Sequence, residues 1–134
     1  MRRVVVTGLG IVCSIGNTIQ ETIASLREGK SGITASSDYQ RMGFRSQVEG
    51  SVKIDIDSAV DRRARRFMGD GAAYNFLAME QALRDSGLDE KDVVNERTGL
   101  IMGSGGPSTR AIVAAADTAR SEPTKGPKIG RAHV

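Results

Sequence analysis

The stretch Arg-Val-Val-Val-Thr-Gly-Leu-Gly at residues 3–10 decides the fold class of this chain. Its first five residues are a short β-branched run, typical of a strand buried on both faces in an α/β protein. The two glycines then predict a turn. Asn17, with Gln20 three residues later, predicts the N-cap and capping box of a helix. The chain is therefore expected to open with a strand, a turn and a helix.

The next residues predict how that helix packs and ends. Ile19, Ile23 and Leu26 recur at the spacing of one buried helix face, and Gly29 fits the position just after a helix. Residues 30–50 are polar and rich in glycine, which indicates a surface excursion.

An edge strand and a short helix are expected after the excursion. Apolar and polar residues alternate over residues 52–56, which is the pattern of a short strand. Asp57 or Ser58 is then expected to cap a helix that carries Asp-Arg-Arg-Ala-Arg-Arg, residues 61–66.

The strongest helix signal runs from about Arg66 to Ser86, and Gly87 predicts its end. The apolar residues of this segment share one helix face. They are Ala72, Phe76, Met79 and Leu83, widened by Ala73, Leu77 and Ala82.

A second apolar strand is expected at residues 100–102. A helix capped near Ser108 follows, with Ile112, Val113 and Ala116 on one side. The order strand, helix, excursion, helix, strand, helix predicts an α/β fold with a parallel sheet.

Composition limits the class of function. A net charge of +3 over 134 residues is too mild to indicate nucleic-acid binding. No apolar stretch approaches the roughly 18 residues of a membrane span, so no membrane partner is expected. The opening apolar run is too short for a signal-peptide core, and the single cysteine precludes an internal disulfide, so we expect a cytoplasmic protein.

The residues that carry chemistry predict no catalytic, cofactor or metal site. Residues 8–13 lack the third glycine of a dinucleotide fingerprint, because Cys13 stands there. Ala24 stands where a P-loop ending at residues 29–31 needs its first glycine. With only Cys13 and His133, neither an activated thiol nor a zinc site is expected.

Four of the five residues after Asp61 are arginines. On a helix, Arg62 and Arg66 share a face and Arg63 lies beside them, at a cost of about 0.2–0.5 kcal/mol per like-charged pair. Solvation, or pairing with Asp57 and Asp61, is one interpretation. The other is a docking surface for an acidic partner, and the residues alone leave both open.

Several separated motifs, in the same order, resemble those of β-ketoacyl-acyl-carrier-protein synthases. The likeness runs from Met1 to about Lys128 and is greatest to the type I enzymes. The motifs are Val-Val-Thr-Gly-Leu-Gly-Ile-Val at 5–12, Ser-Ile-Gly-Asn at 14–17, Leu-Arg-Glu-Gly-Lys-Ser-Gly-Ile at 26–33, Asp-Arg-Arg-Ala-Arg-Arg-Phe-Met at 61–68 and Gly-Ser-Gly-Gly at 103–106.

The resemblance implies a thiolase-like fold, in which two α/β halves stack in five layers, α-β-α-β-α, usually as a homodimer. These enzymes act in fatty-acid biosynthesis. They condense an acyl thioester, held on a cysteine, with malonyl-acyl-carrier protein, and two histidines assist. Those catalytic positions come later in the family's sequence, and Cys13 does not match them. We therefore expect the first part of the N-terminal half, inactive alone and without a cofactor.

The resemblance also implies two kinds of site. Arg62, Arg63 and Arg66 resemble the basic positions that dock acyl carrier protein, with Lys125 and Lys128 as further candidates. Gly106 resembles the position that lines the acyl tunnel near the dimer interface, where a residue without a side chain leaves room for the acyl chain.

The chain is expected to divide into an incomplete synthase domain, residues 1–128, and an unrelated end, residues 129–134. The end reads Ile-Gly-Arg-Ala-His-Val, as one frame of a common sequencing adapter encodes, and is predicted to be an artefact. The alternatives are a fragment of a polyketide ketosynthase or of its chain-length partner, and a standalone binding module for acyl carrier protein.

Overall fold

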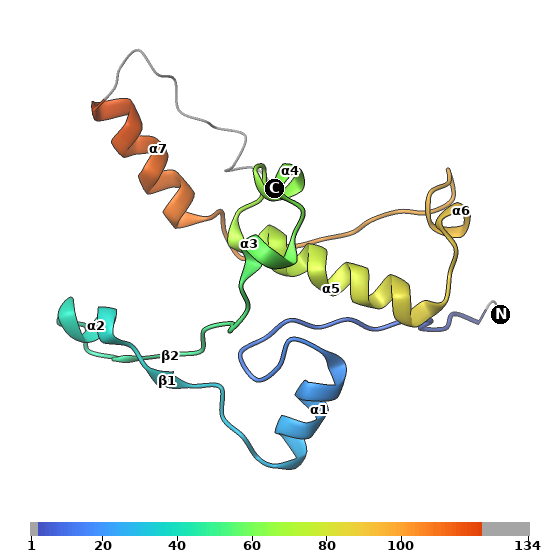
Figure 1. The fold of residues 1–134 in the computed structure, drawn as a ribbon, viewed down its shortest axis with the longest axis horizontal. Helices are drawn as coiled ribbons and strands as arrows, with labels where there is room; N and C mark the ends of the chain where they lie inside the picture. Colours follow the sequence, from blue (N-terminus) through green and yellow to red (C-terminus); the bar gives the residue numbers. More distant parts are fainter. Residues whose placement is uncertain (1–2, 122–134) are drawn as a thin grey trace. The chain divides into compact units, whose positions relative to one another are not determined.

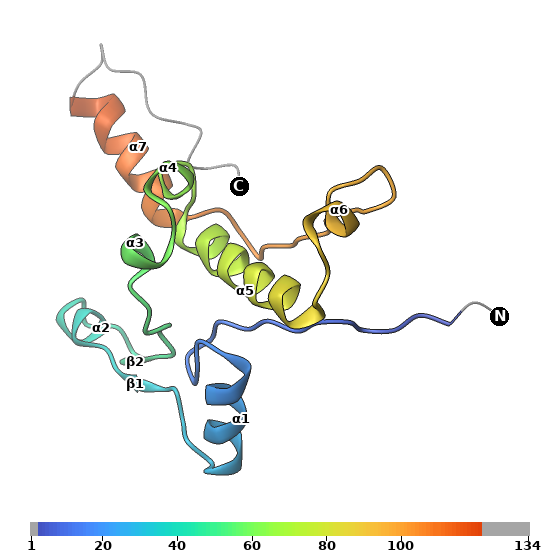
Figure 2. The same cartoon turned by 45° about the vertical axis from the view of Figure 1, so that its right-hand side comes forward.

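The computed structural model describes residues 3–121, which form helices joined by long irregular segments (Figure 1). The chain divides into two units: unit 1 is Met1–Ile54 with Ala78–Gly87, and unit 2 is Asp55–Leu77 with Leu88–Val134. The elements are α1 (Ile19–Arg27), β1 (Thr34–Ala35), α2 (Ser37–Arg41), β2 (Val48–Glu49), α3 (Ile56–Ala59), α4 (Arg62–Arg65), α5 (Asp70–Ser86), α6 (Glu90–Val93) and α7 (Thr109–Ser121). Figure 2 shows them from a second direction.

In unit 1 the opening segment runs alongside the C-terminal half of α5 (Figures 1 and 2). The backbone N–H of Leu9 donates to Asp85 Oδ2 at 2.9 Å, and that of Ile11 donates to Gln81 Oε1 at 3.2 Å. Gly8 and Gly10 face the α5 backbone so closely that added Cβ atoms would overlap its carbonyl oxygens. The predicted turn at these glycines is therefore wrong, because they serve close approach.

The predicted buried strands at residues 3–7 and 100–102 are also wrong within the described residues. Neither segment pairs with a neighbour there, and Val4 and Ile101 are 95% and 98% exposed. A strand satisfies its backbone groups only on a partner strand. The ladder within residues 3–121 is a short antiparallel one, β1 with β2, instead of the predicted parallel sheet. The strand predicted at 52–56 is absent from this part, where Ile56 begins α3.

The N-terminus of α1 differs from the prediction by one residue. Thr18, not Asn17, is the N-cap, and its Oγ1 accepts from the N–H of Glu21 at 3.2 Å. The Glu21 carboxylate in turn accepts from the N–H of Asn17 at 2.7 Å. The prediction for the other end is confirmed, because Gly29 has φ +63° just after the helix.

The buried face of α1 is polar instead of apolar. Ile23 and Leu26 are exposed, whereas Thr22 and Ser25 are buried. Ser25 Oγ donates to the carbonyl of Ile15 at 2.6 Å, so this face packs on the backbone of the tight loop before the helix. The predicted apolar face is wrong because the helix meets polar backbone there.

Unit 2 contains the apolar core of the described residues, which is small. It consists of Ile56 and Val60, from α3 and its C-cap, and of Ala73 and Leu77 from α5. The α5 stripe expected from the sequence is buried or half-buried, as predicted, and Gly87 ends the helix with φ +67°. The helix begins at Asp70 and not near residue 66, because the chain first forms α4.

The caps of the short helices also differ from the prediction. Asp55 caps α3 and Asp61 caps α4, in place of Asp57 or Ser58. The start of α7 is as predicted, since Ser108 Oγ accepts from the N–H of Ala111 at 3.3 Å. Its expected buried side is wrong for two of its three residues: Ile112 and Val113 are 44% and 58% exposed, whereas Ala116 is half-buried.

Among residues 3–121 no helix has both the length and the apolar character needed to cross a membrane.

Candidate functional site

The candidate site is built on α4, a helix of 4 residues that Asp61 starts. Asp61 Oδ1 accepts from the N–H of Arg63 at 2.9 Å and from that of Ala64 at 3.3 Å, which satisfies donors that no helical carbonyl can reach. At about 100° per residue, Arg66 and Arg63 lie about 40° and 100° from Arg62 on one side of the helix. The helical phase therefore gathers these three arginines on one face.

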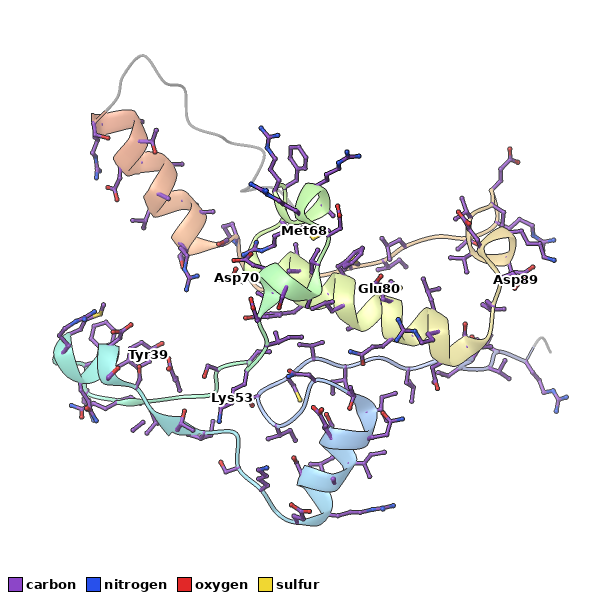
Figure 3. All side chains as sticks on the ribbon, viewed as in Figure 1. Tyr39, Lys53, Met68, Asp70, Glu80 and Asp89 are labelled. Carbon is purple, nitrogen blue, oxygen red and sulfur yellow. The ribbon has the colours of Figure 1, made fainter. Side chains whose placement is uncertain are left out.

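We call Arg62, Arg63, Arg66 and the adjoining Phe67 the basic surface. All four are exposed, and nitrogen-tipped side chains spread outward from α4 near Met68 (Figure 3). Phe67 is 57% exposed, and the guanidinium carbon of Arg66 lies 5.8 Å from the centre of its ring. Such a cation–π contact keeps an aromatic ring at the surface among positive charges. The surface therefore presents both positive charge and an exposed apolar ring, and an acidic partner could contact both.

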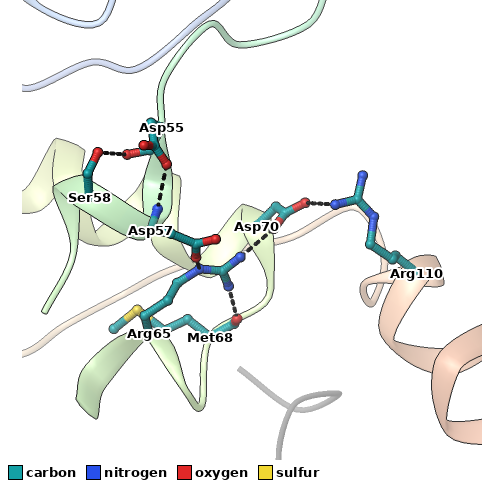
Figure 4. Close-up of polar contacts among 7 residues, drawn as sticks. All are labelled: Asp55, Asp57, Ser58, Arg65, Met68, Asp70 and Arg110. Carbon is teal, nitrogen blue, oxygen red and sulfur yellow. Dashed lines mark hydrogen bonds and ion pairs between the residues drawn. The ribbon is translucent and has the colours of Figure 1, made fainter. Parts of the chain in front are cut away.

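Arg65 behaves differently from its neighbours, because its side chain is only 24% exposed. Its Nε donates to Asp57 Oδ1 at 2.9 Å, its Nη2 donates to Asp70 Oδ1 at 3.1 Å, and its Nη1 donates to the carbonyl of Met68 (Figure 4). Arg65 thus joins α3, α4 and the start of α5. Pairing of this arginine cluster with Asp57 was one of the interpretations that the sequence left open, and it is found at Arg65. The bonds of Arg65 to Asp70 and to the Met68 carbonyl were not predicted.

Of the two aspartates considered as partners of the four arginines, Asp57 pairs with Arg65, and within residues 3–121 no ion pair joins either aspartate to Arg62 or Arg63. Asp57 accepts from the Arg65 side chain, and Asp61 accepts from backbone N–H groups of its own helix. Both line one hollow with Arg62, Arg63, Arg65, Arg66, Phe67 and Met68. The interpretation in which these carboxylates neutralise the basic surface is therefore weaker than it was from the sequence.

Asp70 continues the network that Arg65 begins. Its second carboxylate oxygen, Oδ2, lies 3.2 Å from Nη1 of Arg110 in the first turn of α7 (Figure 4). One carboxylate therefore holds an arginine on either side. The sequence analysis did not identify Asp70 or Arg110.

Gly106 lies on an exposed segment just before α7. The Ser104 hydroxyl donates to the carbonyl of Gly106 at 2.6 Å, and a Cβ added at Gly106 would meet nothing within 4 Å. The structure thus places the three candidate docking arginines, Arg62, Arg63 and Arg66, on one face of α4, and the tunnel candidate, Gly106, on a separate loop. Lys125, Lys128 and residues 129–134 lie outside the described residues.

Among the described residues, the Asp55 carboxyl that caps α3 has a lowered pKa. Its side-chain hydrogen bond with Ser58 is the main cause that holds this pKa below the ordinary value of 3.8; desolvation opposes that bond, and backbone N–H bonds from Ser58 and Asp57 lower the pKa further. Cys13 is half-buried, with its Sγ 3.7 Å from Thr22 Oγ1. Within residues 3–121 no group of three His, Cys, Asp or Glu side chains is placed to hold a metal ion.

Comparison with known proteins gives one family. The family model described as "Beta-ketoacyl synthase, N-terminal domain" matches residues 1–131. The 3-oxoacyl-[acyl-carrier-protein] synthase 1 of Escherichia coli K12 is 54% identical over 121 residues, which are 90% of this chain and 30% of the relative. The enzyme of the same name from Haemophilus influenzae is 47% identical over 120 residues, again 90% and 30%. The chain thus spans about 30% of the length of these curated relatives.

Solved structures give the same result for the fold. A β-ketoacyl synthase from Burkholderia phymatum matches with a TM-score of 0.78 and 25% identity, over 99% of this chain and 34% of its own. The ishigamide ketosynthase/chain length factor matches with 0.77 and 26%, over 95% and 31%. The chain therefore follows part of the thiolase-like α/β fold, as predicted, even though its outer segments lack strand partners within the described residues.

Proposed function

Because this chain belongs to the β-ketoacyl synthase family, whose N-terminal domain model it matches over residues 1–131, we propose that the protein it forms part of is a 3-oxoacyl-acyl-carrier-protein synthase of fatty-acid biosynthesis. The reaction is a decarboxylative Claisen condensation. Loss of CO2 from malonyl-acyl-carrier protein leaves a carbanion, which attacks an acyl thioester and expels the thiolate that held it. The product is a 3-oxoacyl-acyl-carrier protein, two carbons longer than the acyl group.

The fatty-acid synthase is favoured over the polyketide alternative by similarity. The relatives that are 54% and 47% identical, from Escherichia coli and Haemophilus influenzae, are both named 3-oxoacyl-[acyl-carrier-protein] synthase 1.

This segment supplies recognition and not the nucleophile. Attack on a thioester needs a thiolate activated by a base or a positive field. Cys13 contacts the hydroxyl of Thr22, which is neither. The acyl acceptor cysteine and its histidines therefore belong to other parts of the enzyme.

The contribution of this chain is a docking surface for acyl carrier protein, an acidic partner. One observation supports this proposal: Arg62, Arg63 and Arg66 are exposed on one face of α4. Arg65, by contrast, forms ion pairs with Asp57 and Asp70. Exposed like charges gathered on one face cost free energy in the absence of a partner and speed encounter with an acidic one.

Gly106 is proposed to line the acyl tunnel, and the whole enzyme is proposed to be a homodimer. The support for the tunnel is the resemblance of Gly-Ser-Gly-Gly at residues 103–106 to the motif of the matching family. A larger side chain there would occupy space that an acyl chain needs.

The docking proposal is tested in a chimera in which this chain replaces the matching segment of the Escherichia coli synthase 1, to which it is 54% identical. Reversing two charges, Arg62→Glu with Arg66→Glu, is expected to raise the Kd for acyl carrier protein by about tenfold and to weaken its salt dependence. The matched control is Arg97→Glu, an exposed arginine on the loop after α6, which should leave the Kd unchanged. An unaltered Kd and salt dependence in the double variant would refute the docking proposal.

A further inference from the structure

The docking face of α4 needs an external support, because the helix is too short to hold its own direction. It has 4 residues, whereas isolated helices in water are marginal below about 12–15 residues. The Asp61 cap fixes where α4 begins but leaves its rotation about its own axis open. The contacts of Arg65 leave the helix and can fix that rotation.

Arg65 lies on the side of α4 away from Arg63, about 60° from Arg62. Its guanidinium donates three hydrogen bonds: to Asp57 of α3, to Asp70 of α5 and to the Met68 carbonyl (Figure 4). A planar fork of donors can span two carboxylates at once, which the point charge of a lysine cannot do with the same geometry. With Arg65 held inward, the remaining arginines must face outward.

Asp70 is the fixed end of this support. It is the first residue of α5, where a negative charge is favoured by the helix dipole, and its side chain is 34% exposed. It holds Arg65 with Oδ1 and Arg110 with Oδ2. The second bond restrains the carboxylate from the opposite side, so that its first oxygen stays directed at Arg65.

We propose that Arg65 and Asp70 are positioning residues for docking: through the bonds Arg110–Asp70–Arg65 they hold Arg62, Arg63 and Arg66 in the orientation that an acidic carrier protein recognises. This inference rests on the proposed docking function. It adds that two residues which do not face the partner determine the affinity for it.

The direction in which one substitution changes the Kd distinguishes this proposal from simple electrostatic attraction. Asp70→Asn removes a negative charge near a surface that attracts an acidic partner. Coulomb attraction alone therefore predicts tighter binding of the carrier protein. Loss of the support predicts weaker binding, by about fivefold, since contacts within one hydrogen-bonded network are strongly coupled.

A second substitution distinguishes the bonding geometry of the Arg65 guanidinium from its positive charge. Arg65→Lys keeps the positive charge but loses the fork, and it should raise the Kd as much as Arg65→Gln does. The matched control is Arg97→Lys, at an exposed position on the loop after α6 and outside the basic surface, where the Kd should stay within about twofold of the parent. If Arg65 touched the carrier protein as a simple charge, Lys would preserve binding at position 65 as well.

The Kd of acyl carrier protein for the chimera carrying each variant is measured by isothermal titration calorimetry. Circular dichroism of each variant is the control for folding. A variant of Asp57, Asp57→Asn, provides the same sign test at an exposed carboxylate (80% exposed), where a folding defect is not expected. Weaker binding in Asp70→Asn, Asp57→Asn and Arg65→Lys supports the inference. Tighter or equal binding in the two Asn variants overturns it, even if Arg62→Glu with Arg66→Glu still raises the Kd, so the two proposals fail separately.

Discussion

The close approach of the opening segment to α5 predicts that Gly10→Ala destabilises the protein strongly. A Cβ at Gly10 would overlap the carbonyl oxygen of Ala78 and lie 2.8 Å from the backbone nitrogen of Ala82. Both neighbours are main-chain atoms of a helix, so neither can rotate away. The opening segment and α5 must separate to admit the methyl group.

That separation has two costs. Overpacking against a rigid surface costs about 1–3 kcal/mol. It also stretches the bond from the N–H of Ile11 to Gln81, a half-buried hydrogen bond of 3.2 Å, and such a bond contributes about 0.5–1.5 kcal/mol. We therefore expect Gly10→Ala to lower the free energy of unfolding by roughly 2–4 kcal/mol.

The assay is urea unfolding of the chimera, with the slope of the transition fitted together with its midpoint. Gly71→Ala is the matched control, because Gly71 lies in the first turn of α5 and a Cβ there would meet nothing within 4 Å. It should raise stability by about 0.4–1 kcal/mol, since alanine reduces the freedom of the unfolded chain and favours helix. If Gly10→Ala were as stable as the parent, the segment would not lie against α5 as described.

Three further predictions use the same assay. Thr18→Ala removes the N-cap of α1 and should cost about 1 kcal/mol. Thr118→Ala, within α7, removes a hydroxyl that only bonds back to the carbonyl of Ala114, and it should change stability by less than about 0.5 kcal/mol. Leu77→Ala deletes a core side chain that is 8% exposed and should cost about 2–5 kcal/mol, against a negligible change for Val94→Ala, which is 72% exposed. The pKa of Asp55 is lowered in the folded protein, so its carboxylate stabilises the fold above the ordinary pKa of 3.8, and this stabilisation is lost as pH falls through the folded value. The parent should therefore lose stability relative to Asp55→Asn between about pH 5 and pH 2. Parallel pH profiles of the two proteins would contradict this prediction.

Local patterns in the sequence predicted the helices best. The apolar stripe of α5 and the glycines that end α1 and α5 are found as expected, because both features depend on residues within a turn or two of one another. Motifs spread over the chain also identified the family, which no single motif would have done.

The errors share one physical cause. The runs at residues 3–7 and 100–102 have strand composition, but a strand forms only where a second strand supplies its hydrogen bonds, and residues 3–121 provide none for them. The apolar face expected for α1 failed for a related reason, since what a helix buries depends on what lies against it.

For the docking site, the sequence by itself determined that arginines crowd on one short segment, and the family resemblance suggested which of them dock. Only the tertiary structure decided that Arg65 leaves this group. Its two aspartates come from helices on either side of α4, and which charges meet depends on how those helices pack. Composition fixes how many charges a segment has, whereas packing fixes which of them remain available to a partner.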